Sequence, residues 1–215
     1  MKNLVQAGLV ISMIFLYASS FGQSKMSGSQ PQKTYLDIFI SAVGTDLNYG
    51  ASNSSLTDFK KSAQGIQAGV SLQTEIASHL SLVPELSFIM RGGKLKVNNP
   101  YVQDAYTLRF YSIEIPVLVR LHLGKFHVNA GPALAYNFAG NQKLDGSTTK
   151  LSFDNAIGGF KRLDAGIQIG GGLTFKIKQK RAMLDIRYCY GLTNVSYDKE
   201  IYNRSLLIRL NISKK

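Results

Sequence analysis

Ionisable side chains recur at every second position of otherwise apolar segments, and they are the residues best placed to carry chemistry. Glu114 and Arg120 occupy such positions in one segment, and Asp185 and Arg187 do so in another. Strict period-two alternation is typical of a two-faced strand, so these charges share a face opposite the apolar side chains. The full set comprises Asp37, Glu75, Glu85, Arg91, Glu114, Arg120, Asp164, Asp185, Arg187 and Arg209. Because arginine pairs bidentately with carboxylates, we expect an ion-pair network that fills a lumen; a narrow ion path or gate is the alternative.

No catalytic or metal-binding pattern stands out. His79, His122 and His127 map to one end of the expected strands, but their spacing matches no zinc site, and HExxH and GxSxG are absent. Ser112 and the histidines of its hairpin lie at opposite ends of that hairpin. Cys189, the single cysteine, excludes an internal disulfide and suits a small inward space filler. We therefore expect no enzyme, no metal and no cofactor. The opposing hypothesis, a lipid-modifying enzyme, requires a nucleophile–base pair near the membrane boundary.

Eight alternating segments must position these side chains. The clearest is the hairpin YSIEIPVLVRLHLGKFHVNAGPALAYNF at 111–138, which turns at Gly124-Lys125. The eight segments lie near 35–45, 65–77, 80–91, 108–123, 126–138, 162–177, 182–192 and 204–213. Their connections alternate between tight turns and long polar stretches at 46–64, 92–107, 139–161 and 193–203. This arrangement predicts an all-β fold, an eight-stranded antiparallel up-and-down transmembrane β-barrel.

Alternation alone does not decide which face points outward, because a soluble barrel has the same period. No lysine falls in the middle of an expected strand, whereas a soluble barrel would carry this strongly hydrated residue on its outer face. Tyrosine and phenylalanine gather toward the two ends of the segments, as in interfacial girdles. The segments are also long enough to cross a bilayer. We therefore expect apolar side chains to face lipid and charged ones to face the lumen.

The first residues indicate a cleavable signal peptide. Lys2 provides the positive region, 9–16 the apolar region, and Ser20-Phe21-Gly22 the small residues before a cleavage site between Gly22 and Gln23. The apolar stretch is shorter than the roughly 20 residues that span a membrane. We expect a signal peptide at 1–22, a flexible periplasmic leader at 23–34 and a barrel domain at 35–215. Both termini would then be periplasmic.

The segments also carry a family resemblance. YSIEIPVLVRLHL followed by AGPALAYNF resembles the PorT-like outer-membrane β-barrel domain family of Bacteroidetes-type bacteria, as do RLDAGIQIGGGLTF, LDIRYCYGLTNV and NRSLLIRLNI. The resemblance covers essentially the mature chain and implies an eight-stranded outer-membrane barrel. It also implies a possible role as an accessory component of a protein-secretion system. The chain ends in Ser213-Lys214-Lys215, which departs from the terminal aromatic residue of many outer-membrane barrels.

The formal net charge of +12 is concentrated at the short-turn end. Lysines there either anchor the barrel at the interface or attract anionic lipid headgroups or an acidic partner. Nucleic acid is not expected, because no basic face interleaved with aromatic residues is evident.

These observations favour a monomeric, non-enzymatic outer-membrane barrel with a plugged lumen, in contact with outer-membrane lipids, that interacts through long extracellular loops. The alternatives are the secretion accessory, whose partner would co-purify, and a narrow porin-like channel, which would conduct ions in a planar bilayer. Loops on a rigid scaffold often carry recognition. The stretches 46–64 and 139–161 are thus the expected contact surfaces.

Overall fold

A computed structural model describes residues 33–100, 103–178 and 180–213. The expected signal peptide, its cleavage site at Gly22 and Gln23, and the leader up to residue 32 lie outside these residues. Among the residues described, no helix is long and apolar enough to cross a membrane.

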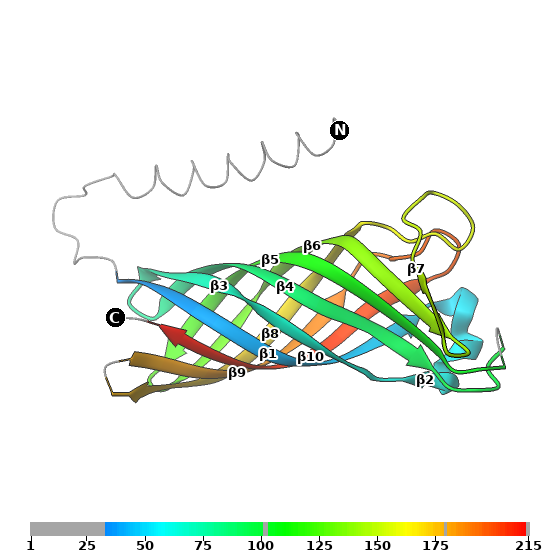
Figure 1. Cartoon of the computed structure of the whole chain (residues 1–215). Helices are drawn as coiled ribbons and strands as arrows, with labels where there is room; N and C mark the ends of the chain where they lie inside the picture. Colours follow the sequence, from blue (N-terminus) through cyan, green and yellow to red (C-terminus); the bar gives the residue numbers. More distant parts are fainter. Residues whose placement is uncertain (1–32, 101–102, 179, 214–215) are drawn as a thin grey trace. The chain divides into compact units, whose positions relative to one another are not determined.

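The described chain forms a closed antiparallel barrel of eight long strands, with two short strands and one 3₁₀ helix at one end (Figure 1). The elements are β1 Thr34–Tyr49, η1 Ala51–Phe59, β2 Lys60–Lys61, β3 Ala63–Ala77, β4 Leu80–Leu95, β5 Tyr106–Leu123, β6 Phe126–Leu144, β7 Ser147–Lys150, β8 Leu163–Ile177, β9 Lys180–Gly191 and β10 Ile201–Ser213. Each long strand pairs with its sequence neighbour, and β1 pairs with β10 from Asp37↔Ser213 to Tyr49↔Ile201. Closure gives the first and last strands partners on both sides, so the barrel wall has no free edge.

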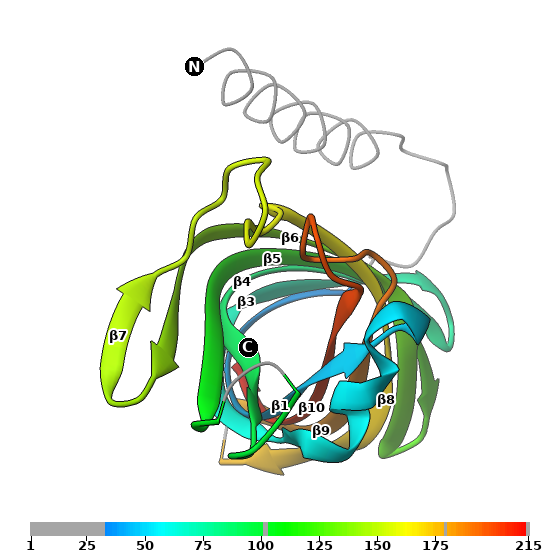
Figure 2. The same cartoon turned by 90° about the vertical axis from the view of Figure 1, so that its right-hand side faces the viewer.

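The two ends of the barrel differ in their connections. At the turn end, short turns join β3 to β4, β5 to β6 and β8 to β9, and the start of β1 and the end of β10 also lie there. At the loop end are η1, β2, β7 and the long connections, and Figure 2 looks into the barrel from this side. The alternation of short and long connections matches the sequence prediction.

The strands extend further toward the loop end than the sequence indicated. The stretch 46–64 was expected to be a loop, but β1 continues to Tyr49 and η1, β2 and the start of β3 follow. Likewise, β4 continues to Leu95, β5 begins at Tyr106, and β6 reaches Leu144 and forms a hairpin with β7. The prediction of loops was wrong there because cross-strand pairing, such as Asp46↔Arg204 and Thr107↔Lys143, continues where the sequence turns polar.

The orientation of the faces follows the sequence prediction. Ile167 and Ile208 are 46% and 52% exposed on the outer surface, whereas Glu114, Arg187 and Arg209 are at most 1% exposed inside. Leaving this much apolar surface in water would be strongly unfavourable, whereas lipid tails surround it without cost. Near the loop-end boundary the Arg204 guanidinium stacks 3.4 Å from the ring centroid of Tyr190, as expected for an interfacial girdle.

Candidate functional site

The lumen holds the buried charges. Asp185 and Arg187 project from β9 two residues apart and therefore share the inner face. Opposite them on β8, Gly170 and Gly172 pair with Arg187 and Asp185. A Cβ on Gly170 would lie 2.7 Å from Arg187 Cγ, and one on Gly172 would lie 2.5 Å from Asp185 Oδ1. Glycine at these two positions thus leaves the space that the charged side chains occupy.

At the centre of the lumen, Glu85 joins two arginines from the other side of the barrel. Arg187 Nη1 donates to both carboxylate oxygens of Glu85 at 3.0 Å, and Arg209 Nη1 donates to Oε2 at 2.7 Å. Arg209 also donates to Gln67 Oε1 at 2.8 Å, and its guanidinium lies 3.8 Å from the ring centroid of Phe39. The Glu85 carboxylate and both guanidinium groups are therefore paired with opposite charges inside the protein.

The network continues toward the turn end. Arg187 Nη2 lies 2.9 Å from Asp185 Oδ2, and Arg120 Nη2 lies 3.5 Å from the same oxygen. The other oxygen of Asp185 is bound by His127 Nε2. Asp185 thus joins β5, β6 and β9 across the barrel interior.

A separate ion pair, between Arg181 and Asp37, lies at the turn end of the lumen. Arg181 Nη2 lies 3.1 Å from Asp37 Oδ2, and its guanidinium stacks 4.0 Å from the ring centroid of Tyr35. Arg181 is not among the ten lumen charges that the sequence singled out. The signal that could have found it is its phase on the strand, since Arg181 lies two residues before Met183 and four before Asp185, both of which point inward from β9.

Toward the loop end, Gln67 Nε2 donates to Glu114 Oε2 at 3.2 Å and so extends the chain of contacts. Arg91 lies between two acids, 3.0 Å from Glu114 Oε1 and 3.1 Å from Asp164 Oδ2. Asp164 in turn accepts from Asn203 Nδ2 at 2.8 Å. Polar contacts therefore run without a break from His127 to Asn203.

The structure brings together nine of the ten charges that the sequence singled out, in two groups. Glu85, Arg91, Glu114, Arg120, Asp164, Asp185, Arg187 and Arg209 form the lumen network, and Asp37 pairs separately with Arg181. Glu75 is half-buried beside a bulge and forms no ion pair within the described residues. Adding Arg181, the lumen contains five acids and five arginines, so their formal charges cancel.

A cavity of about 20 Å³ lies within the network, beside Arg91 and Glu114. Gln168 Oε1 and Asn203 Oδ1 line it and have no protein partner. This volume has room for about one water molecule. Cys189, 7% exposed, also lines it and is a small inward residue as expected.

A serine–histidine contact was missed by the sequence analysis. Ser81 Oγ lies 2.8 Å from His122 Nε2, and the two residues are on adjacent strands at the turn end. A serine nucleophile also needs an oriented base and access to substrate. Among the residues described, the side chains in hydrogen-bond contact with the His122 ring are Ser81 and Gln73, neither of which is a carboxylate, and Ser81 is 0% exposed. Ser112, the serine considered from the sequence, instead hydrogen-bonds Asn137 Oδ1 at 2.6 Å. Nor do the described residues contain a group of three potential metal ligands.

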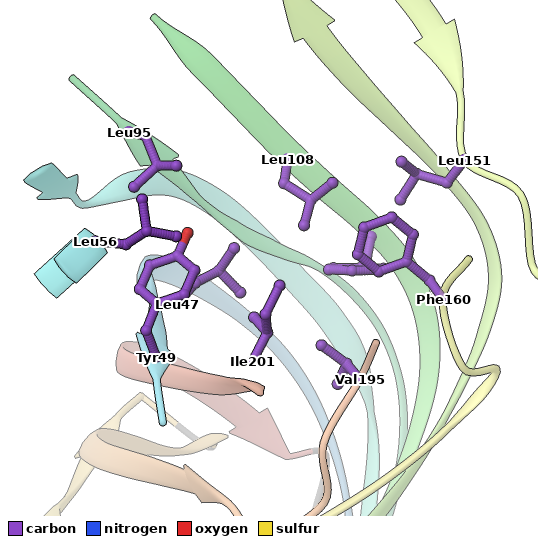
Figure 3. Close-up of a cluster of buried hydrophobic side chains, with 10 residues drawn as sticks. Leu47, Tyr49, Leu56, Leu95, Leu108, Leu151, Phe160, Val195 and Ile201 are labelled. Carbon is purple, nitrogen blue, oxygen red and sulfur yellow. The ribbon is translucent and has the colours of Figure 1, made fainter. Parts of the chain in front are cut away.

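An apolar cluster fills the loop end of the lumen and was also missed. We call it the loop-end cluster, and its side chains point toward one another from several segments (Figure 3). Its members are Leu47, Tyr49, Leu56, Leu95, Leu108, Phe110, Leu151, Phe160, Val195 and Ile201. The sequence signal was present in β5, where Leu108 and Phe110 continue the inward phase of Ser112 and Glu114.

Comparisons with known proteins agree with this geometry. A family model described as outer membrane protein beta-barrel domain matches residues 21–197. No curated protein matches the chain. Among solved structures, the crystal structure of neisserial surface protein A (NspA) has a TM-score of 0.52 at 14% identity, covering 86% of this chain and 100% of NspA. Ail of Yersinia pestis has a TM-score of 0.44 at 9% identity, covering 85% of this chain and 99% of Ail.

At these identities the likeness to NspA concerns the fold alone. The family model, however, spans most of the chain, including every strand from β1 to β9. The chain therefore belongs to the family of outer membrane protein β-barrel domains and is a protein of the bacterial outer membrane.

Proposed function

We propose that this protein is a non-conducting, non-enzymatic barrel that supports a recognition surface at its loop end. The observation that carries the proposal is the unbroken run of buried polar contacts from His127 to Asn203, with room for about one water in the cavity beside it. Eight strands leave an interior that side chains can fill. Ions would have to displace paired, desolvated charges to pass.

The loop end is the surface we propose for recognition. The hairpin of β6 and β7 projects from the barrel wall (Figure 2), and all four β7 residues are exposed. One edge of β7 pairs with β6, and its other edge has no strand partner among the residues described. Such an edge can accept an extended segment of a partner by strand addition. The proposed placement is that the loop end faces outward and both termini are periplasmic.

Planar-bilayer recordings test whether the polar network blocks the lumen. We expect no unitary current steps from the wild type. The triple variant E85A/R187A/R209A should conduct, because it removes the central ion pairs, whereas E75A should stay silent. Steps in the wild type at the same frequency as in the triple variant would contradict the proposal and favour the narrow channel.

Pull-down from detergent-solubilised membranes tests recognition. The wild type and a variant with 143–150 replaced by a two-residue Asn-Gly turn should differ in their bound proteins. A secretion component among them would support the PorT-like alternative. Identical bound proteins would show that the hairpin is not the contact surface.

Cysteine labelling tests the placement. The native Cys189 is buried and should not react in the folded protein. D145C should react with a membrane-impermeant maleimide on intact cells, whereas K125C should react only after the outer membrane is permeabilised. The reverse pattern would invert the proposed orientation.

A further inference from the structure

The loop-end cluster encloses a pocket that has no part in the proposed plug. Its volume is about 300 Å³. We call it the mouth pocket, and its apolar wall is formed by Tyr49, Leu56, Leu95, Leu108, Phe160 and Ile201. These side chains come from β1, η1, β4, β5, β10 and the connection before β8, and they face a common space (Figure 3). We propose that the mouth pocket binds a small, neutral, largely hydrocarbon molecule.

The polar groups at the pocket are already engaged, which defines the class of ligand. The Tyr106 hydroxyl donates to Gln142 Oε1 at 2.9 Å. Lys199 Nζ pairs with Asp198 Oδ2 at 3.4 Å, so its charge is offset. Pockets that bind small molecules are mostly apolar with few polar groups, and they begin at about 300 Å³. A neutral molecule of about ten to fifteen non-hydrogen atoms suits this pocket.

The pocket ends blindly within the barrel. Along the inner face of β5, Leu108 lines the pocket and Glu114 belongs to the lumen network, six residues or about 20 Å further down. Phe110 lies between them and packs against Phe160 with ring centroids 5.4 Å apart. A ligand would therefore be retained at the mouth rather than conducted through the lumen.

A latch holds the element that covers the pocket. Leu56 of η1 is 1% exposed and forms part of the wall. The N-terminal end of η1 is tied to the β9–β10 connection by Glu200 Oε2, which accepts from Ser52 N at 3.1 Å and from Ser52 Oγ at 2.8 Å. Gly50 N also donates to Glu200 O at 3.0 Å, and Glu200 N donates to Asn53 Oδ1 at 2.8 Å. These bonds all lie beyond Tyr49↔Ile201, the last pair of β1 and β10, so η1 can open while the barrel wall stays paired, which gives a ligand a way in and out.

Fluorescence titration of 1-aminoanthracene, a neutral probe of suitable size, tests the proposal. The full-length protein would be embedded in lipid nanodiscs, and the signal from empty nanodiscs would be subtracted. We expect saturable binding of about one probe per barrel. Decanol, which is neutral, should compete with the probe, whereas the dianion decanedioate should not. Non-saturable partitioning equal to that of empty nanodiscs would overturn the proposal.

Two isoleucines of β10 give a matched pair of variants. I201W should fill the pocket and weaken probe binding at least about tenfold, whereas I208W, on the lipid-facing side, should leave binding unchanged. If I201W fails to fold, E200Q provides the second test, since it leaves the pocket intact but weakens the latch. We expect E200Q to speed probe release several-fold. Full probe binding by folded I201W would refute the site, and so would an unchanged release rate in E200Q. The non-conducting lumen is tested by bilayer conductance and the mouth pocket by probe binding, so the two proposals can be refuted independently.

Discussion

Replacing Glu85 by glutamine is the sharpest perturbation of the lumen network. In the wild type its carboxylate has contacts of 3.0 Å and 2.7 Å to two buried arginines. In E85Q, Arg187 keeps Asp185 as a partner, but Arg209 loses its only carboxylate within 4.0 Å among the described residues. Removing one partner of a buried ion pair costs about 3–5 kcal/mol, because the remaining charge is uncompensated. We expect the free energy of unfolding to fall by about that amount.

Urea titration of the barrel in lipid vesicles measures this change. With a slope of about 2 kcal/mol per molar urea, a loss of about 4 kcal/mol lowers the midpoint by about 2 M. The matched control is E75Q, which makes the same chemical change at a half-buried carboxylate and should stay within about 0.5 kcal/mol of the wild type. Adding R209M to E85Q should recover part of the loss by removing the unpaired charge. A midpoint for E85Q equal to that of E75Q would refute the reasoning.

Three further outcomes are expected. Hydrogen bonds from the backbone N–H and then the hydroxyl of Ser52 lower the pKa of Glu200 below its ordinary 4.5. The bonds from Ser52 to the Glu200 carboxylate should therefore be complete above pH 4.5 and be lost as the pH falls through the lowered pKa of the folded state. Hydrogen exchange of the η1 amides should become faster over that pH range in the wild type, whereas in E200Q it should not depend on pH in this way. The variant G172A should lose about 1–3 kcal/mol because its Cβ would lie 2.1 Å from a backbone oxygen, whereas G44A, with 3.9 Å to its nearest such atom, should unfold at the wild-type midpoint. Cys189 should react with a maleimide only after unfolding, since it is 7% exposed; rapid labelling of the folded barrel would mean that the lumen is open.

The barrel and its two faces could be predicted from the residue pattern. Alternation around Ile113 and Glu114 fixed which side chains share a face, and the exclusion of lysine from strand centres indicated that the apolar face meets lipid. It also identified nine charges that the structure buries. These features could be predicted because successive side chains of a strand alternate between its two faces, and the polarity of each side chain must suit the surroundings of its own face.

The pairing of the charges depends on the folded barrel and could not be predicted from the residue pattern. Glu85 and Arg209 are 124 positions apart, and their contact depends on the register around the closed barrel. The loop-end cluster likewise arises where β1, β4 and β5 continue past the apolar band and turn apolar side chains inward. Strand period gives the direction of a side chain but not its partner, because the partner is set by the stagger of strands that are remote in sequence.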